Sequence, residues 1–250
     1  MKLTIKKDAI EFRKELGYGH TDALNLTNVL IKLNIITVFK RLSDGFSGMA
    51  LSSGDRKFIL INSAHSRGRQ NFSICHELYH LFKDDEFKPH HSYAGSFNRK
   101  SNEFLADTFA SYFLLPDDGV LSHIPDAELI KDRIETSTIL KIEHYFGCSR
   151  NALLYRLKEL GLISPTSYDK HNQSIIRTAR LNGYSTELYE PGNNGKVIGD
   201  YGPLAKSLYD QEKISESHFH GLMNDIGIDI FNNTYDEDPD YKFSKPYRYR

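Results

Sequence analysis

Two histidines one helical turn apart, with a glutamate directly after the first, are the residues best suited to chemistry in this sequence. They are His76, Glu77 and His80, within the stretch 69–82. On an α-helix each residue advances by about 100°, so the two imidazoles would lie on one face. Zinc binds neutral imidazole nitrogens at about 2.0–2.1 Å, and this spacing supplies two of them. Glu77 would lie where it could accept a proton from a water molecule activated by the metal.

The same segment has an apolar face opposite the two histidines. Its residues are Ile74, Cys75, Leu78, Leu81 and Phe82. Such a face packs against a core and leaves the histidine face available to a metal. Two surface histidines on an amphipathic helix would give the same pattern, so a zinc site needs a third ligand elsewhere in the chain.

The segment from Glu103 to Pro116 offers that ligand. It is apolar on almost all sides, which is typical of a buried helix, and Pro116 predicts its end. Buried carboxylates are costly unless paired or metal-bound, and Glu103 and Asp107 share one face. We expect Glu103 to be the third zinc ligand and Asp107 to hold a ligand histidine by its ring N–H. The alternative is that Glu103 only stabilises the helix start through the helix dipole.

A third histidine that continues the motif is excluded. Metzincins need Gly and His at positions where this sequence has Lys83 and Glu86. The ligand set that remains is His76, His80 and Glu103.

A polar loop is predicted over 83–100, and it contains His90 and His91. A loop beside a catalytic helix could act as a lid or contribute a proton donor. The residue that stabilises the transition state therefore stays open among Tyr79, His90, His91 and others.

Composition narrows the class of protein. The 250 residues are 39% hydrophobic and 26% charged with a net charge of −1, which is typical of a globular chain. This charge argues against direct nucleic-acid binding through basicity. No stretch reaches the ~20 apolar residues of a membrane span, and the N-terminus lacks the apolar core of a signal peptide. Two cysteines are too few for a disulfide framework. We expect a cytoplasmic protein with no membrane partner.

The periodicity predicts an α+β fold with a small antiparallel sheet packed with mostly helices. Three strand-like runs separated by turn residues lead into the His76 helix, and such a sheet could pair with an extended peptide. A helical region would follow, ending in a mobile tail from Asn232. The expected helices are 5–16, 21–33, 172–181, 202–211 and 215–225; the expected strands are 35–39, 48–51 and 58–61, with a hairpin over 185–198.

The segment 136–163 has the spacing of a helix-turn-helix. Its polar side chains that could face a DNA groove are Arg150, Asn151, Tyr155 and Arg156. The leucines of the same segment also explain it as an ordinary packed helix pair, which we favour.

Taken together, these motifs resemble the ImmA/IrrE family of metallopeptidases over about residues 20–165. The matching positions are Arg69-Gln70-x-Phe72, His76-Glu77-Leu78-x-His80, Glu103-x-x-Ala106-Asp107-x-Phe109-Ala110, Leu114-Leu115-Pro116, Phe146-Gly147-Cys148-Ser149-Arg150-x-Ala152-Leu153-x-x-Arg156-Leu157 and Leu160-Gly161-Leu162-Ile163. Tyr79 departs from the family pattern, which usually has a small Gly there, and this affects the shape of the pocket. The resemblance implies a zincin-like zinc protease of a bacterium, phage or mobile element. Known members cleave or inactivate helix-turn-helix repressors and so switch on stress or transfer genes.

We therefore expect a zinc endopeptidase that acts as an anti-repressor, with a helix-turn-helix repressor as its substrate. The zincin-like domain would span 1–165, including the helix pair 136–163, and a C-terminal accessory region would span 166–250. The alternative is a DNA-binding regulator with a structural zinc and a helix-turn-helix at 136–163. Glu77 and a set of only three ligands favour catalysis, because structural zinc sites are usually closed by four.

Overall fold

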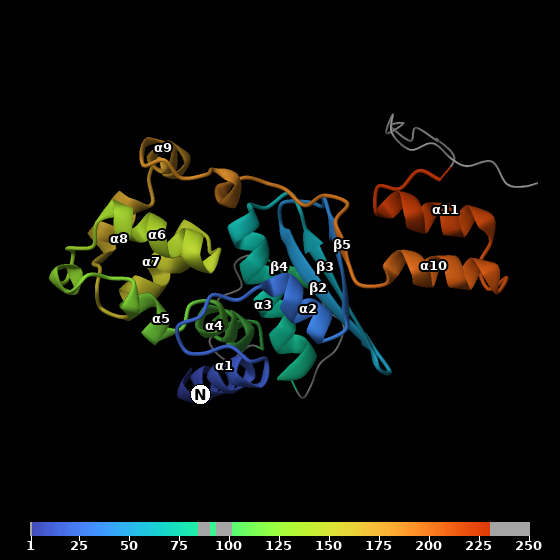
Figure 1. Cartoon of the computed structure of the whole chain (residues 1–250), viewed down its shortest axis with the longest axis horizontal. Helices are drawn as coiled ribbons and strands as arrows, with labels where there is room; N and C mark the ends of the chain where they lie inside the picture. Colours follow the sequence, from blue (N-terminus) through green and yellow to red (C-terminus); the bar gives the residue numbers. More distant parts are fainter. Residues whose placement is uncertain (1, 85–90, 94–101, 231–250) are drawn as a thin grey trace, which may run out of the picture. The chain divides into compact units, whose positions relative to one another are not determined.

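A computed structural model describes residues 2–84, 91–93 and 102–230, with the side chains of 91–93 excepted (Figure 1). Its contacts divide the chain into two compact units, Met1–Tyr201 and Gly202–Arg250. Within the described residues, no helix is long and apolar enough to cross a membrane. The tail predicted from Asn232 lies outside the described residues.

A five-stranded mixed sheet forms part of the first unit. Its order is β4-β2-β3-β1-β5. The strands are β1 Ile35–Lys40, β2 Phe46–Ser53, β3 Arg56–Asn62, β4 His91–Tyr93 and β5 Val197–Ile198. The α+β class is confirmed, but the expectation of an antiparallel sheet is wrong. β2 and β3 form the expected hairpin, whereas β1 runs parallel to β3 and pairs with it from Ile35↔Lys57 to Lys40↔Asn62.

Four helices build the core on which the sheet packs. They are α1 Lys2–Glu15, α2 Leu26–Lys32, α3 Arg67–Phe82 and α4 Asn102–Leu114. α3 contacts β2, β3 and α4, and α4 also contacts α1. Phe12, Phe109 and Phe113 are buried at the junction of α1 and α4, with ring centroids 5.2–6.1 Å apart. The metal-binding candidates of α3 and α4 therefore stand on two helices fixed by one core.

A buried arginine explains why α2 begins at Leu26 and not near residue 21. Arg13 donates to the carbonyl oxygens of Gly19, Asp22 and Phe113. Residues 19–22 wrap around this guanidinium, so their carbonyls are turned away from a helical pattern. Asn25 then caps α2 by accepting a hydrogen bond from the Asn28 amide at 3.0 Å.

Short helices form a second group in the first unit, beside α3 and α4 in Figure 1. They are α5 Asp117–Ser122, α6 Thr136–Phe146, α7 Arg150–Glu159, α8 Pro165–His171 and α9 Ile175–Leu181. α6 and α7 are the predicted helix pair, joined by Gly147 in the left-handed conformation. The predicted helix 172–181 is confirmed from Ile175 as α9, and it starts three residues later than expected.

The helix pair buries the arginines that a DNA-binding helix would expose. Arg150 is 2% exposed and binds Glu143 through an ion pair and the His171 carbonyl oxygen at 2.7 Å. Arg156 is 1% exposed and pairs with Asp117 and Glu159. Neither side chain can reach a phosphate, so the packing interpretation of 136–163 accounts for both arginines.

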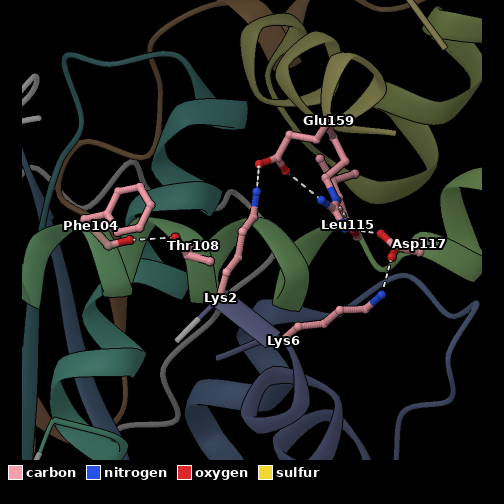
Figure 2. A network of polar contacts seen from close by, with 8 residues as sticks. Lys2, Lys6, Phe104, Thr108, Leu115, Asp117 and Glu159 are labelled. Carbon is pink, nitrogen blue, oxygen red and sulfur yellow. Dashed lines mark hydrogen bonds and ion pairs between the residues drawn. The ribbon is translucent and has the colours of Figure 1, made fainter. Parts of the chain in front are cut away.

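Lysines of α1 extend this ionic network (Figure 2). Lys2 pairs with Glu159 at 2.5 Å, and Lys6 pairs with Asp117 at 2.5 Å. Because Arg156 pairs with the same two carboxylates, the network joins α1, α5 and α7.

The segment after α9 returns to the sheet. The expected hairpin over 185–198 is wrong: Glu187–Tyr189 is a 3-10 turn, and β5 pairs with β1 through Thr37↔Ile198. The Gly192 carbonyl oxygen also accepts a hydrogen bond from Gln70 at 3.1 Å. The first compact unit thus extends to Tyr201, beyond the end at 165 that the sequence predicts for the protease domain.

The second unit contains a pair of helices, α10 Tyr201–Asp210, which begins at the boundary, and α11 Glu216–Asp225. Ser215 caps α11 by accepting from the His218 amide at 3.2 Å. The rings of Tyr209 and Phe219 stack between the helices, with centroids 5.1 Å apart. Both helices lie close to the positions that the sequence predicts.

Candidate active site

The buried part of α3 carries the predicted motif. His76, Glu77 and His80 are respectively 6%, 1% and 1% exposed. The opposite side of the helix, with Ile74, Cys75 and Leu78, lies in the hydrophobic core. The polar motif is therefore enclosed, and a buried polar group requires a partner.

The first turn of α4 brings Glu103 to the two imidazoles. Nε2 of His76 lies 3.2 Å from Nε2 of His80. Oε2 of Glu103 lies 3.3 Å from His76 Nε2, and its Oε1 lies 3.4 Å from His80 Nε2. Three donor groups from two helices thus converge on one point, a set that could hold a metal ion.

The spacing of these donors fits a tetrahedral zinc ion. With ligand distances of about 2.0–2.1 Å, two corners of a tetrahedron lie about 3.3 Å apart. The observed separations, 3.2, 3.3 and 3.4 Å, match this edge. Two imidazoles and one carboxylate leave the fourth corner without a ligand from this set, as in catalytic zinc sites.

The outer nitrogen of each imidazole is held by a carboxylate. Asp107 on α4 lies 2.9 Å from His76 Nδ1, and Asp84 lies 3.1 Å from His80 Nδ1. Asn102 donates to Asp84 at 3.1 Å, which fixes this carboxylate in turn. A proton on each Nδ1 would leave both Nε2 lone pairs directed at the metal position.

Charge in this group also favours a cation. Burial lowers the pKa of His76, but hydrogen bonds to Asp107 and Glu103 outweigh it and raise this pKa to about 10. Burial acts to raise the pKa of Glu103, but the two imidazoles hold it well below its usual range. The carboxylates around His76 therefore favour a positive charge at this position, which a bound metal would supply.

Comparison with known families agrees with this geometry. The IrrE N-terminal-like domain of the M78 peptidase family matches residues 32–158, about half of the chain. The chain belongs to this family. A comparison with curated proteins gives no significant match. M78 enzymes are peptidases, so the substrate is a protein or peptide, and the match includes every donor of the site.

Glu77 of this M78 protein lies against strand β2 at Gly48. A Cβ atom at position 48 would be 2.8 Å from Glu77 Oε1 and 3.3 Å from the Leu60 carbonyl oxygen. Only glycine lets the carboxylate lie this close to the strand. Strand β2 therefore leaves room for the Glu77 carboxylate because residue 48 has no side chain.

A cleft of about 950 Å³ opens beside the motif. His76, Glu77 and Asp107 line its metal end, together with Arg69 and Phe72 of α3. Its other walls include residues of α4, α7, α8 and α9, together with Lys2 of α1, Ser47 of β2 and Tyr189. The cleft is large enough for several residues of a peptide.

The structure describes the side chain of one of the three residues predicted as candidates for transition-state stabilisation, Tyr79, His90 and His91. Tyr79 is buried in the core, with its ring centroid 5.6 Å from that of Phe109, and does not line the cleft. His90 and the side chain of His91 lie outside the described residues. Tyr79 is therefore a packing residue, and the role predicted for His90 or His91 stays a prediction.

The sequence does not predict the roles of Asp84 and Gly48. Asp84 is four residues after His80, the spacing of neighbours on one helix face, but it lies where the sequence turns polar. The position of Gly48 depends on a sheet contact far from α3 in sequence. Asp84 could therefore have been found from its spacing to His80, whereas Gly48 could not be found from the sequence near it.

We expect Asp84→Ala to weaken zinc binding by about 10–100-fold, because His80 loses the group that fixes its ring and its tautomer. Asp107→Ala should have an effect of similar size through His76. Competition with a chromophoric chelator measures both, with Asp55→Ala in the β2–β3 turn as a control. Wild-type affinity in Asp84→Ala would show that its bond to His80 does not support the metal.

We expect Gly48→Ala to lower kcat by about 10²-fold, since a displacement of ~1 Å in a catalytic group has such an effect. Zinc content should stay that of the wild type, because Gly48 touches Glu77 and none of the three donors. Gly45→Ala is the matched control, because nothing lies within 4 Å of its added Cβ. Loss of zinc in Gly48→Ala would contradict this assignment.

Proposed function

We propose that this M78-family protein is a zinc-dependent endopeptidase. It would cleave or inactivate a helix-turn-helix transcriptional repressor in the cytoplasm and act as an anti-repressor in a stress, phage or mobile-element switch. One observation carries the proposal: three donors 3.2–3.4 Å apart lie beside a buried glutamate at the end of a long cleft.

In this proposal His76, His80 and Glu103 hold the zinc ion. When bound, zinc would polarise the scissile carbonyl and lower the pKa of water toward ~7. Glu77 accepts a proton from the attacking water and passes it to the leaving amine. Asp107 and Asp84 keep the two imidazoles in the orientation and tautomer that bind metal.

An extended substrate fits the position of the sheet. β2 carries Gly48 beside Glu77 and pairs with β4 at the edge of the sheet. An edge strand can hydrogen-bond to an extended peptide, which aligns its carbonyls along the strand. A flexible or extended segment of a repressor is therefore the expected place of cleavage.

The DNA-binding alternative has less support. Arg150 and Arg156 are buried in ion pairs, and a structural zinc would need a fourth ligand. Among the described residues, the metal-ligand group contains only His76, His80 and Glu103.

Co-expression with a helix-turn-helix repressor encoded beside the gene tests the proposal. Zinc-loaded protein should yield defined repressor fragments in mass spectrometry, and protein stripped with a chelator should yield none until zinc is restored. An intact repressor that nevertheless forms a complex would favour inactivation by binding alone. Sequence-selective, salt-dependent binding of operator DNA would favour the alternative.

A further inference from the structure

The cleft continues well beyond the metal-binding end. Arg69 precedes His76 by seven residues, so both lie on the same face of α3, about 10 Å apart along the helix axis. Both side chains line the cleft. An extended peptide advances by about 3.3 Å per residue, so Arg69 corresponds to a position about three residues from the scissile bond.

The cleft has a surplus of unpaired positive charge. Its cationic residues are Lys2, Arg69, Arg150 and Arg177. Lys2 pairs with Glu159, and Arg150 pairs with Glu143. Among the described residues, Arg69 and Arg177 form no ion pair. Arg69 donates a hydrogen bond to Ser47 at 3.3 Å, and the Asp44 carboxylate acts on it electrostatically without forming an ion pair.

The carboxylates of the cleft do not neutralise these two arginines. Asp107 is hydrogen-bonded to His76, and Glu159 pairs with Lys2 and Arg156. Glu77 lies at Gly48, close to the metal-binding end. Arg69 is half-buried, and a cation withdrawn from water is stabilised most by an anion that binds beside it.

Part of this wall lies beyond the family-matched residues 32–158. Tyr168 of α8 and Ile175, Ile176 and Arg177 of α9 line the cleft. Arg177 and Ile176 are exposed, which is typical of residues on a binding surface. The cleft therefore combines Arg69 of the family-matched region with a second basic residue, Arg177, and apolar residues that lie outside that region.

We propose that Arg69 binds a carboxylate of the substrate, with Arg177 adding positive charge to the same cleft, and makes this peptidase selective for an acidic group about three residues from the cleaved bond. The group is an Asp or Glu side chain, and apolar substrate residues contact Ile175 and Ile176. This inference rests on the proposed peptidase function and adds its substrate class.

Pools of random decapeptides, labelled and amidated at the C-terminus, provide the probe. One central position is fixed as Glu, Gln or Lys, and binding is measured by fluorescence anisotropy with zinc-loaded Glu77→Gln protein. We expect the Glu pool to bind about tenfold or more tightly than the Gln pool, the size of a charge-assisted hydrogen bond. Fragments produced by the wild type should have Asp or Glu enriched near the third position from the cut.

Arg69→Ala and Arg177→Ala should each reduce the preference for Glu, and Arg69→Glu should reverse it toward Lys. Arg180→Ala is the matched control, since Arg180 lies on α9 but does not line the cleft. A Gln pool with a free C-terminus shows whether the cleft binds a terminal carboxylate in place of an acidic side chain. If Arg69→Ala does not fold, the preference of Arg177→Ala for the Glu pool over the Gln pool is the test of the inference.

Equal binding of the Glu, Gln and Lys pools would overturn the inference even if the wild type cuts all three. A preference for Glu without any cleavage would support the recognition surface and refute the endopeptidase function. Preference only for the free C-terminus would replace the side chain as the carboxylate source and overturn the selectivity proposed here.

Discussion

Glu103→Ala is expected to leave the protein with little or no zinc after purification. The variant removes one of three donors and the only one from α4. Its effect should exceed the about 10–100-fold loss typical of a residue that merely supports a ligand. Metal analysis by mass spectrometry, after dialysis against a competing chelator, measures the zinc content of wild type and variant side by side.

The competing explanation of Glu103 makes a different prediction. If its charge only stabilises the first turn of α4, Glu103→Ala would lower the free energy of unfolding by about 0.3–1 kcal/mol and keep full zinc occupancy. Thermal unfolding of the metal-free forms separates the two effects. Full occupancy in the variant would remove Glu103 as a ligand and direct attention to His90 or His91. Glu216→Ala, in the first turn of α11, controls for the loss of a charge at a helix start.

The helices of the site could be predicted because their signals are local. The imidazoles of α3 and the apolar sequence of α4 follow helical periodicity, and both helices end close to the predicted positions. Two carboxylates in an otherwise apolar helix also indicated where the third donor would come from. The metal-ligand group of the structure contains the three residues named from the sequence.

The sheet could not be predicted in the same way. Turn residues between consecutive strands suggest a meander, yet β1 pairs with β3 in parallel and β2 occupies the other side of β3. β5 is only two residues long, so it has no period of its own, and its pairing with β1 depends on 150 or more intervening residues. Pairing between strands far apart in sequence is set by the core that they share, which a local pattern does not contain.

The partners of buried charged residues could not be predicted from the sequence. Arg156 looked available to a DNA groove, but Asp117 and Glu159 neutralise it inside the protein. Arg13 was not singled out because its partners are backbone carbonyls. A buried cation is recognised from its contacts, and those contacts exist only in the folded chain.

Glu77→Gln should abolish peptide cleavage while zinc binding persists. The amide has the shape of the carboxylate but cannot accept a proton from water, and general acid–base catalysis contributes about 10²–10⁴-fold to rate. Glu77 is not among the three donors, so zinc content should equal that of the wild type. Unfolding temperature should change little, because the side chain at position 77 keeps its volume and its contact with Gly48.

Repressor fragments and the decapeptide pools give two independent measures of this loss. Glu216→Gln is the control for the substitution itself, since Glu216 is exposed on α11 of the second unit. Binding of peptide by Glu77→Gln, together with full zinc content, distinguishes a lost proton acceptor from a damaged cleft. Equal fragment yields from Glu77→Gln and the wild type would show that another group accepts the proton. Because Glu77 is held against Gly48, such a result would also predict that Gly48→Ala leaves kcat unchanged. Glu77→Gln and Gly48→Ala therefore test the role of the same carboxylate, one by changing it and the other by displacing it.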